Sequence, residues 1–372
     1  MRFWRWLLPV TAGLALAGTP LGVASSGATT SNPYLHQFTT VTKIASTVPA
    51  NGDVNPYGVA TVTQSTGALV AGDTLVSNFN SKANVQGTGT TIVQVSPSGA
   101  TMLFAHIAKL PAAMSCPGGV GLTTALGILP GGWVVVGSLP TDDGGSLPAG
   151  HRVGCLIVLN ANGMAVETFS NQDIVGPWDM AVASSASTAT LYVSNALGGN
   201  TQTENGHPFA GNCTVARLDL SLSPTGPPTL VSSTVIGSGF SWIANKVALV
   251  LAPTGLALGQ NGTLYVDNTQ TNTVSAIPDA RTRRTPVTRK ASVISSGGGL
   301  NAPLGMTLAP NGDLIVVNGN NGNAVEITPS GKQIARVTLV KNGAGDLFGL
   351  TASPAGIVFV DDGNNSLESF HS

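Results

Sequence analysis

Two long polar segments each lead through one histidine to a cysteine. Leu139–Gly154 leads to Cys155, and Ala196–Asn212 leads to Cys213. Segments of this length inside a compact domain usually carry function or are disordered. Two imidazoles and two thiolates are able to hold Zn²⁺ or copper in a tetrahedral site. The candidate binding residues of the two segments are Asp142, Asp143, His151 and His207.

The cysteines also allow a simpler interpretation. The chain has 3 Cys, so one disulfide leaves one thiol over. In an exported protein a pair of cysteines more often forms a disulfide than a metal site. We expect Cys116 to lie on the same face as Cys155 and Cys213, and Cys155–Cys213 is the first pairing to test. Free thiols and a metal site remain the alternatives.

A second set of candidates consists of oxygen-bearing residues that each follow a short apolar strand. Such a ring of oxygen donors around a channel suits a hard cation, and Ca²⁺ is the cofactor that it suggests. The alternative is that each side chain caps its own turn through backbone hydrogen bonds. Recurrence of one residue type in nearly every repeat favours capping. The ring residues are Asn78, Ser138, Asn195, Asn268, Asn318 and Asp362.

The strands that position these residues come from an internal repeat. Its clearest copy is Ala302–Gly331, in which a Pro-x-Gly turn, an apolar strand, a second turn and a buried strand ending in Asn follow one another. Six such units succeed each other along the chain. Repeats of about 40 to 50 residues that contain several short strands are typical of the blades of a β-propeller. Two units depart from the pattern, because Ser138 replaces the Asn and Asp179 replaces the turn Gly.

The fifth unit resembles the NHL repeat, and the whole set is more distantly similar to SMP-30/lactonase-like and streptogramin-lyase-like propellers. The resemblance implies an all-β, six-bladed propeller with four-stranded antiparallel blades. The calcium-dependent lactonases would imply Ca²⁺ at the channel mouth, although they would offer an early Glu and the first Glu here is Glu167. The lyases would imply a catalytic His near the channel, for which only His151 and His207 are suitably placed.

Strand counting predicts how the ring closes. The last unit supplies three strands, and Thr39–Ile44 is a spare strand before the first unit. We therefore expect the spare strand to complete the last blade, which leaves no open inner edge. The predicted organisation is a signal peptide over 1–28, a linker over 29–38 and one propeller over 39–372.

The beginning of the chain has the pattern of an export signal. Met1–Arg5 carries two positive charges, and Leu7–Ala17 is an apolar run too short to span a bilayer comfortably. A retained membrane anchor is the alternative. We expect an exported protein, periplasmic or extracellular, without a membrane span after cleavage, and a monomer. The net charge of −1 does not indicate a nucleic-acid partner.

Two further groups complete the candidates. Aromatic residues near the starts of inner strands could line a binding mouth, although core packing is the alternative: Tyr57, Trp178, Phe348 and Trp242. Arg281–Lys290 holds five of the 16 basic residues and should lie on the opposite face, as a solvated loop or as a site for an anionic partner.

The sequence predicts a binding or scaffold module acting through the loop face of units two and three on an unknown protein or small-molecule ligand. The alternative is a cation-dependent hydrolase or lyase at the channel mouth.

Overall fold

The structure is a computed structural model and describes residues 32–141, 154–197, 209–245 and 249–372. Pro33–Ser372 forms one compact unit, and Met1–Asn32 is assigned to another. The predicted signal peptide therefore lies outside the described residues. So do four of the predicted binding residues: Asp142, Asp143, His151 and His207.

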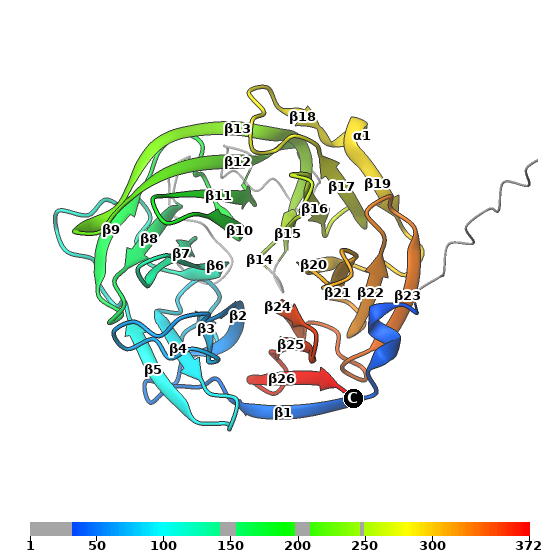
Figure 1. Ribbon diagram of the computed structural model, residues 1–372, viewed down its shortest axis with the longest axis horizontal. Coiled ribbons are helices and arrows are strands. Elements are labelled where there is room, and N and C mark those ends of the chain that lie inside the picture. The colour runs from blue at the N-terminus through cyan, green and yellow to red at the C-terminus, as the bar shows by residue number, and fades with distance from the viewer. Residues whose placement is uncertain (1–31, 142–153, 198–208, 246–248) are drawn as a thin grey trace, which may run out of the picture. The chain divides into compact units, whose positions relative to one another are not determined.

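Six antiparallel sheets stand around a central axis, which confirms the predicted propeller (Figure 1). Blade one contains β2 (Val54–Thr61), β3 (Thr74–Asn80), β4 (Thr91–Val95) and β5 (Thr101–His106). Blade two contains β6 (Leu122–Leu129), β7 (Trp133–Ser138), β8 (Cys155–Leu159) and β9 (Ala165–Phe169). Blade three contains β10 (Pro177–Ser184), β11 (Thr188–Asn195), β12 (Phe209–Ser223) and β13 (Gly226–Asn245), extended by β14 (Leu249–Leu251) and β18 (Val287–Thr288).

The remaining blades follow the same order from the axis outward. Blade four contains β15 (Pro253–Leu258), β16 (Leu264–Asn268), β17 (Thr273–Ile277) and β19 (Val293–Ser296), which follows the short helix α1 (Arg289–Ser292). Blade five contains β20 (Pro303–Leu308), β21 (Leu314–Asn318), β22 (Asn323–Ile327) and β23 (Gln333–Thr338). Blade six contains β24 (Leu347–Ser353), β25 (Gly356–Asp361), β26 (Ser366–His371) and, from the other end of the chain, β1 (Thr40–Ser46).

Strand β1 closes the ring as predicted. It pairs antiparallel with β26, from Thr40 opposite His371 to Ser46 opposite Ser366. The two strands run side by side in Figure 1. The 3-10 helix η1 (Tyr34–Gln37) precedes β1, and the buried carboxylate of Glu326 accepts the backbone N–H groups of Tyr34 and Leu35, both at 2.8 Å. The start of the described chain is thus tied to blade five as well as to blade six.

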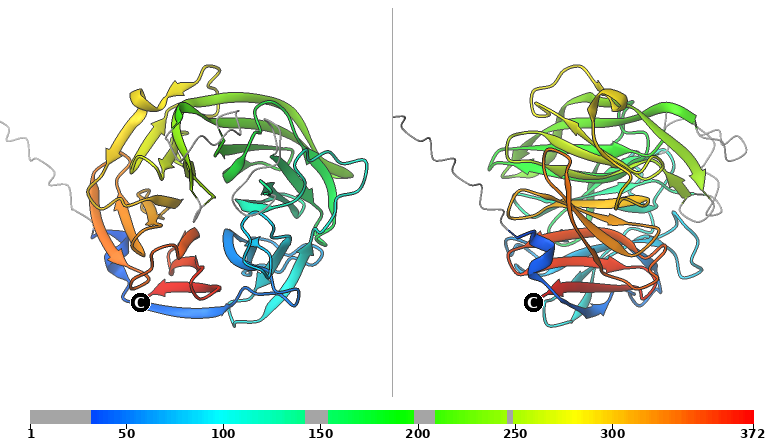
Figure 2. Two further views of the ribbon diagram at one scale, coloured as in Figure 1. Left: turned by 180° about the vertical axis from the view of Figure 1, so that it is seen from behind. Right: turned by 90° about the vertical axis from the view of Figure 1, so that its right-hand side faces the viewer.

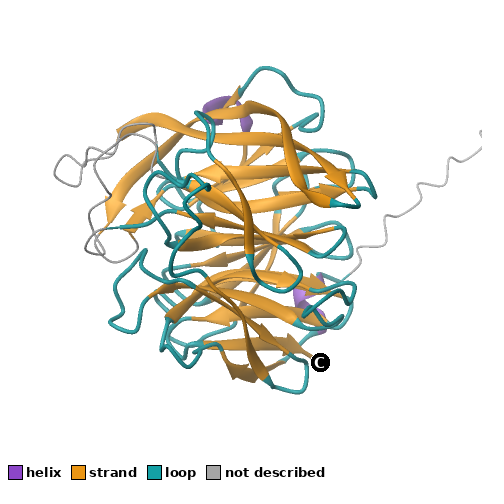
Figure 3. Cartoon of the chain, turned by 90° about the vertical axis from the view of Figure 1, so that its left-hand side faces the viewer, coloured by secondary structure: helices purple, strands orange, loops and turns teal. Residues whose placement is uncertain are grey.

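The middle strands are buried because each blade packs face to face with its neighbours. Every residue of β3, β4, β8, β16 and β21 is buried. Strands buried on both faces read as continuous apolar runs rather than as alternating ones. Figures 2 and 3 show the sheets stacked around the ring with loops at both ends of the strands. No helix among the described residues is long and apolar enough to cross a membrane.

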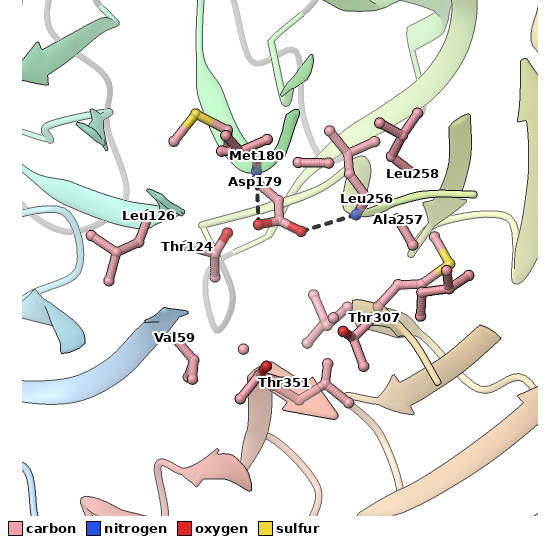
Figure 4. A pocket seen from close by; sticks show the side chains of 18 residues that line it. Val59, Thr124, Leu126, Asp179, Met180, Leu256, Ala257, Leu258, Thr307 and Thr351 are labelled. Atoms are coloured by element: carbon pink, nitrogen blue, oxygen red, sulfur yellow. Dashed lines mark hydrogen bonds between the residues drawn. The ribbon is translucent and has the colours of Figure 1, made fainter. Parts of the chain in front are cut away.

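The Gly of the repeat allows the innermost strands to approach each other. A Cβ atom at Gly305 would lie 1.9 Å from the carbonyl oxygen of Phe348, and one at Gly349 would lie 2.2 Å from that of Tyr57. Contacts that short are impossible for a side chain, so only Gly fits at these positions. In blade three the equivalent residue is Asp179, whose side chain points into the channel instead (Figure 4).

Blade three also corrects two predictions. Strand β12 begins at Phe209, so the last four residues of the predicted polar insertion Ala196–Asn212 are strand. Trp242 lies in β13, the fourth strand of its blade, and not near the start of an inner strand as predicted. The long β12–β13 pair explains both differences, because Trp242 pairs with Phe209 in an extension beyond the ordinary blade.

Candidate functional site

Most of the predicted ring residues are engaged in internal hydrogen bonds. Four buried asparagines each donate through Nδ2 to a backbone carbonyl upstream of their blade's first strand, at 2.8–3.1 Å: Asn78 to Thr47, Asn195 to Asp173, Asn268 to Ser241 and Asn318 to Gly299. Ser138 donates to the carbonyl of Gly119 at 3.0 Å in the same way. These bonds are structural, but they differ from the turn-capping alternative, because each reaches 19 to 31 residues back to the chain that enters the blade and not to the side chain's own turn.

The sixth ring residue, Asp362, is placed differently. It is the one member of the ring that lines a cavity of about 570 Å³ among the described residues at the channel mouth. We call this cavity the mouth pocket. It is lined by residues of every blade but blade two: Asn55, Tyr57, Asn80, Asn84, Gln86, Leu251, Thr269, Ala302, Leu304, Gly319, Asn320, Ala344, Gly345, Asp346, Phe348 and Asp362.

An aromatic cluster lies beneath the mouth pocket. The Tyr57 ring stacks between Phe79 and Phe348, with centroid distances of 4.6 and 4.1 Å. Trp178 packs edge-on against Tyr57 at 5.7 Å. Tyr57 and Phe348 line the pocket, whereas Trp178 is buried and does not. The predicted aromatic residues therefore form a packed core, two members of which also make the pocket floor.

Unpaired acceptors mark the wall of the mouth pocket. Asn55 Oδ1 and Asn80 Oδ1 have no hydrogen-bond partner among the described residues, although the two side chains are only 4% and 2% exposed. The other ends of both amides are used, since Asn80 Nδ2 donates to Asn84 Oδ1 at 2.7 Å and Asn55 bonds to the Tyr57 hydroxyl. An unpartnered buried polar group costs about 1–3 kcal/mol. A bound molecule that donates hydrogen bonds would remove this cost.

Two carboxyl groups stand at the rim of the same pocket. Burial raises the pKa of Asp362 to about 7, and the charges of Asp346 and Asp361 add to the rise. The pKa of Asp346 is also raised, by burial and by Asp361. No Lys, Arg or His is among the described residues that line the pocket. The pocket therefore offers acceptors and a carboxyl group that titrates near neutral pH.

A second, smaller cavity lies further along the channel (Figure 4). We call it the inner chamber; it has a volume of about 270 Å³ and is lined by the first strands of all six blades. Asp179 is the one titratable side chain among its described lining residues. Its carboxyl accepts the N–H of Met180 at 2.8 Å and that of Leu256, in the next blade, at 2.9 Å. Burial nevertheless raises the pKa of Asp179 to about 8.

Asp267 lies close to Asp179 and is fully buried. Its Oδ1 accepts the Thr254 hydroxyl at 2.5 Å and the Gly255 N–H at 2.8 Å, whereas Oδ2 has no partner among the described residues. Burial raises the pKa of Asp267 to about 7, against these hydrogen bonds. At the same place in blades one and three stand Ser77 and Ser194, which accept a first-strand N–H at 3.0 and 3.1 Å.

The cysteines do not pair as first expected. Cys116 and Cys155 form the disulfide, with their Cα atoms 5.3 Å apart, and Cys213 is free and buried. The expected Cys155–Cys213 bond is therefore wrong. The reason is packing, because Cys116 and Cys155 belong to one apolar cluster between blades one and two, while Cys213 is in the large cluster around the axis. The disulfide also removes Cys155 from the predicted His–Cys metal site.

No set of three His, Cys, Asp or Glu side chains in the described ranges is grouped so as to hold a metal ion. From the sequence we predicted Asp362 as a candidate cation ligand and Tyr57 and Phe348 as aromatic residues that could line the mouth. We did not predict Asn55, Asn80 or Asp346. Only a weak sequence feature pointed to Asp346. It is an acidic residue directly before β24, and Asp362 comes directly after β25, the strand that pairs with β24.

Comparisons with known proteins give the fold. Neither the family models nor the curated protein sequences give a match, so the NHL assignment is not confirmed. A gluconolactonase of Xanthomonas campestris is 13% identical over 86% of this chain and 87% of its own, with a TM-score of 0.51. The calcium-binding protein regucalcin of Agrobacterium tumefaciens is 13% identical over 88% and 93%, with a TM-score of 0.50.

A virginiamycin B lyase of Staphylococcus aureus is 16% identical over 89% of this chain and 88% of its own, with a TM-score of 0.49. Identities this low establish architecture alone, because one fold carries many activities. The chain is a six-bladed propeller that is distantly similar in structure to the gluconolactonase and to regucalcin.

Proposed function

We propose that this protein is a ligand-binding propeller and that it takes a small molecule rich in hydrogen-bond donors, of the size of a sugar, in the mouth pocket. The observation that carries the proposal is the concentration of acceptors there. Asn55 Oδ1 and Asn80 Oδ1 lack partners, and Asp346 and Asp362 add two carboxyl groups. Hydroxyl groups of a ligand would satisfy all four.

The apolar floor and the size of the pocket fit the same class of ligand. Tyr57 and Phe348 provide aromatic carbon beneath the acceptors, and a volume of about 570 Å³ is within the range of small-molecule sites. The absence of Lys, Arg and His from the described lining disfavours an anionic ligand. A gluconolactonase has the same architecture, so aldonolactones belong among the compounds to test.

Binding to a panel of monosaccharides, aldonolactones and polyamines tests the proposal. Thermal shift identifies the binders, and titration calorimetry then compares wild type with Asp362→Asn. The matched control is Asp279→Asn, because the side chain of Asp279 is 81% exposed and does not line the pocket. We expect about tenfold weaker binding by Asp362→Asn, in line with a lost charge-assisted hydrogen bond, and none by the control. Equal affinity in all three proteins would refute the site.

A divalent cation is the second candidate, and with it a hydrolase or lyase activity at the same mouth. The charge of Asp346 helps to raise the pKa of Asp362, which is the behaviour of carboxyl groups close enough to share a cation. A bound Ca²⁺ would polarise a carbonyl oxygen of a substrate such as a lactone. Regucalcin, which shares the fold, is a calcium-binding protein.

Metal content separates the two candidates. The protein is purified without chelator, and its Ca²⁺ is measured by mass spectrometry together with turnover of a lactone panel. One Ca²⁺ per chain that is lost in Asp346→Asn supports the enzyme. Absence of the ion, of calcium-induced thermal stabilisation and of turnover leaves the binding protein.

We also propose export from the cytoplasm, because the Met1–Ala17 pattern is that of a signal peptide.

A further inference from the structure

A cleft between blades three and four, on the face opposite the channel mouth, has features that the proposed function does not use. It has a volume of about 480 Å³ and lies between the β10–β11 turn, the β15–β16 turn and the chain that follows β17. The strands of the two blades are neighbours in Figure 1. The polar residues that line the cleft are Ser184, Ser185, Thr188, Thr190, Tyr192, Gln260 and Arg281.

One cation of this cleft is unpaired. Arg281 has neither an ion pair nor a hydrogen bond within the described part of the chain, whereas Arg283 lies 4.0 Å from Asp279. The carboxylate of Asp219, which accepts the hydroxyl of the cleft residue Thr190 at 3.1 Å, is already neutralised, because Arg217 Nε donates to it at 3.1 Å and the Ser232 hydroxyl at 2.9 Å. The charge that remains in the cleft is therefore positive.

Hydrogen bonds to neighbouring backbone carbonyls hold the backbone on both sides of Arg281 in place. The buried Arg217 donates to the carbonyl of Ala280 at 3.2 Å and to that of Arg283 at 2.8 Å, on both sides of Arg281. Ala280 N–H also bonds to the carbonyl of Gly262 at 3.0 Å. The backbone at the base of the Arg281 side chain is therefore fixed before binding, and only the rotamers of that side chain remain to be ordered.

A buried hydroxyl without a partner faces the same place. Tyr192 is fully buried, lines the cleft, and its hydroxyl has no hydrogen-bond partner among the described residues. Burial raises the pKa of Tyr192, and of the charges around it Arg281 acts most strongly in the opposite direction. The hydroxyl and the guanidinium are therefore near neighbours that share no acceptor.

We propose that this cleft is an oxyanion site that binds a phosphate or sulfate group carried by a small molecule. The donors are the Arg281 guanidinium, the Tyr192 hydroxyl and the Gln260 amide, with the hydroxyl groups of Ser184 and Thr188 at the rim. More than two donors that line one cleft suit a phosphate or sulfate group, which has three free oxygens when it is carried as a monoester, better than a carboxylate with two. The volume leaves room for the organic group that carries the anion.

Titration of the full chain with inorganic phosphate, at constant ionic strength, tests the proposal. We expect saturable binding by wild type with a dissociation constant of about 1 mM, at least tenfold weaker binding by Arg281→Gln, and weaker binding by Tyr192→Phe. The matched control is Arg284→Gln, which removes the same charge from the same exposed loop but lies outside the cleft.

The variants give separable outcomes. No saturable binding by wild type, or equal weakening by Arg281→Gln and Arg284→Gln, would overturn the proposal, because the second result means attraction to a basic loop alone. Thermal unfolding of Tyr192→Phe is measured alongside. A change in its unfolding midpoint with unchanged phosphate affinity would assign the hydroxyl a purely structural role and contradict its place in the site.

Discussion

Asp267 is expected to make the fold less stable as the pH rises. Its pKa in the folded protein is about 7, whereas an ordinary Asp has 3.8. Between these values the unfolded chain has lost the proton and the folded chain still holds it, so raising the pH favours unfolding. Raising the pH from 5 to 7 spans about 2 pH units, over which the free energy of unfolding falls by about 3 kcal/mol. Above about pH 8, where Asp267 has lost its proton in the folded protein as well, this contribution is constant.

The substitution Asp267→Ser isolates this contribution. Serine occupies the equivalent place in blades one and three, where Ser77 and Ser194 accept a first-strand N–H and donate to a carbonyl of the next blade, at 2.8 and 2.7 Å. The replacement therefore keeps a bonding pattern that the fold already uses.

Urea unfolding followed by Trp fluorescence at pH 5 and pH 8 provides the assay. Asp362 contributes in the same direction and cancels in the comparison, because it is present in both proteins. Asp179 cancels only in part, because the charge of Asp267 helps to raise its pKa and is lost in Asp267→Ser. Wild type should lose about 3 kcal/mol more than Asp267→Ser over this range. Equal pH dependence of the two proteins would refute the reasoning, and so would a wild type that gains stability with pH.

Two further predictions concern the ring itself. Replacing Cys116 by Ser should lower the free energy of unfolding by about 4 kcal/mol, which is the loop entropy for a separation of 39 residues. Peptide mapping under non-reducing conditions tests the pairing itself, and a peptide that links Cys213 to Cys116 or Cys155 would contradict it. Replacing Glu326 by Gln should cost about 2 kcal/mol and speed proteolysis near η1, because a buried carboxylate that accepts two backbone N–H groups is lost. Limited proteolysis with mass spectrometry checks the second, and an unchanged cleavage rate would count against it.

The architecture could be predicted because short sequence patterns that determine local structure recur along the chain. The Pro-x-Gly turns, the buried apolar strands and the closing Asn recur in most units, and each has a local cause. Gly305 is needed where Phe348 of the next blade approaches, and Asn318 binds the chain entering its own blade. The spare strand at the N-terminus then follows from counting, and β1 confirms it.

The candidate site could be predicted only in part, because it depends on contacts between blades. Asn55 and Asp346 lie 291 residues apart in sequence yet line the same pocket. The repeat also misled, since three of the four asparagines at the ends of second strands use their side-chain oxygen to accept a backbone N–H: Asn195, Asn268 and Asn318. Asn78 Oδ1 has no partner among the described residues, but Asn78 does not line the pocket.

Departures from the repeat were the better guide. Asp361 lies opposite Leu347 as Asn318 lies opposite Pro303, so blade six has an acid where four other blades have Asn, and Asp362 follows it directly. Asp179 stands where four other units have Gly. Cysteine pairing failed for a related reason, because packing between blades one and two decided it.

A crystal structure of the complex with the tightest binder of the panel tests the central claim most directly. The ligand should lie over Tyr57 and Phe348, with its hydroxyl groups donating to Asn55 Oδ1 and the Asp362 carboxyl. Ligand density on the loops of blades two and three, with the mouth pocket unchanged, would contradict the account and favour the interface first expected from the sequence.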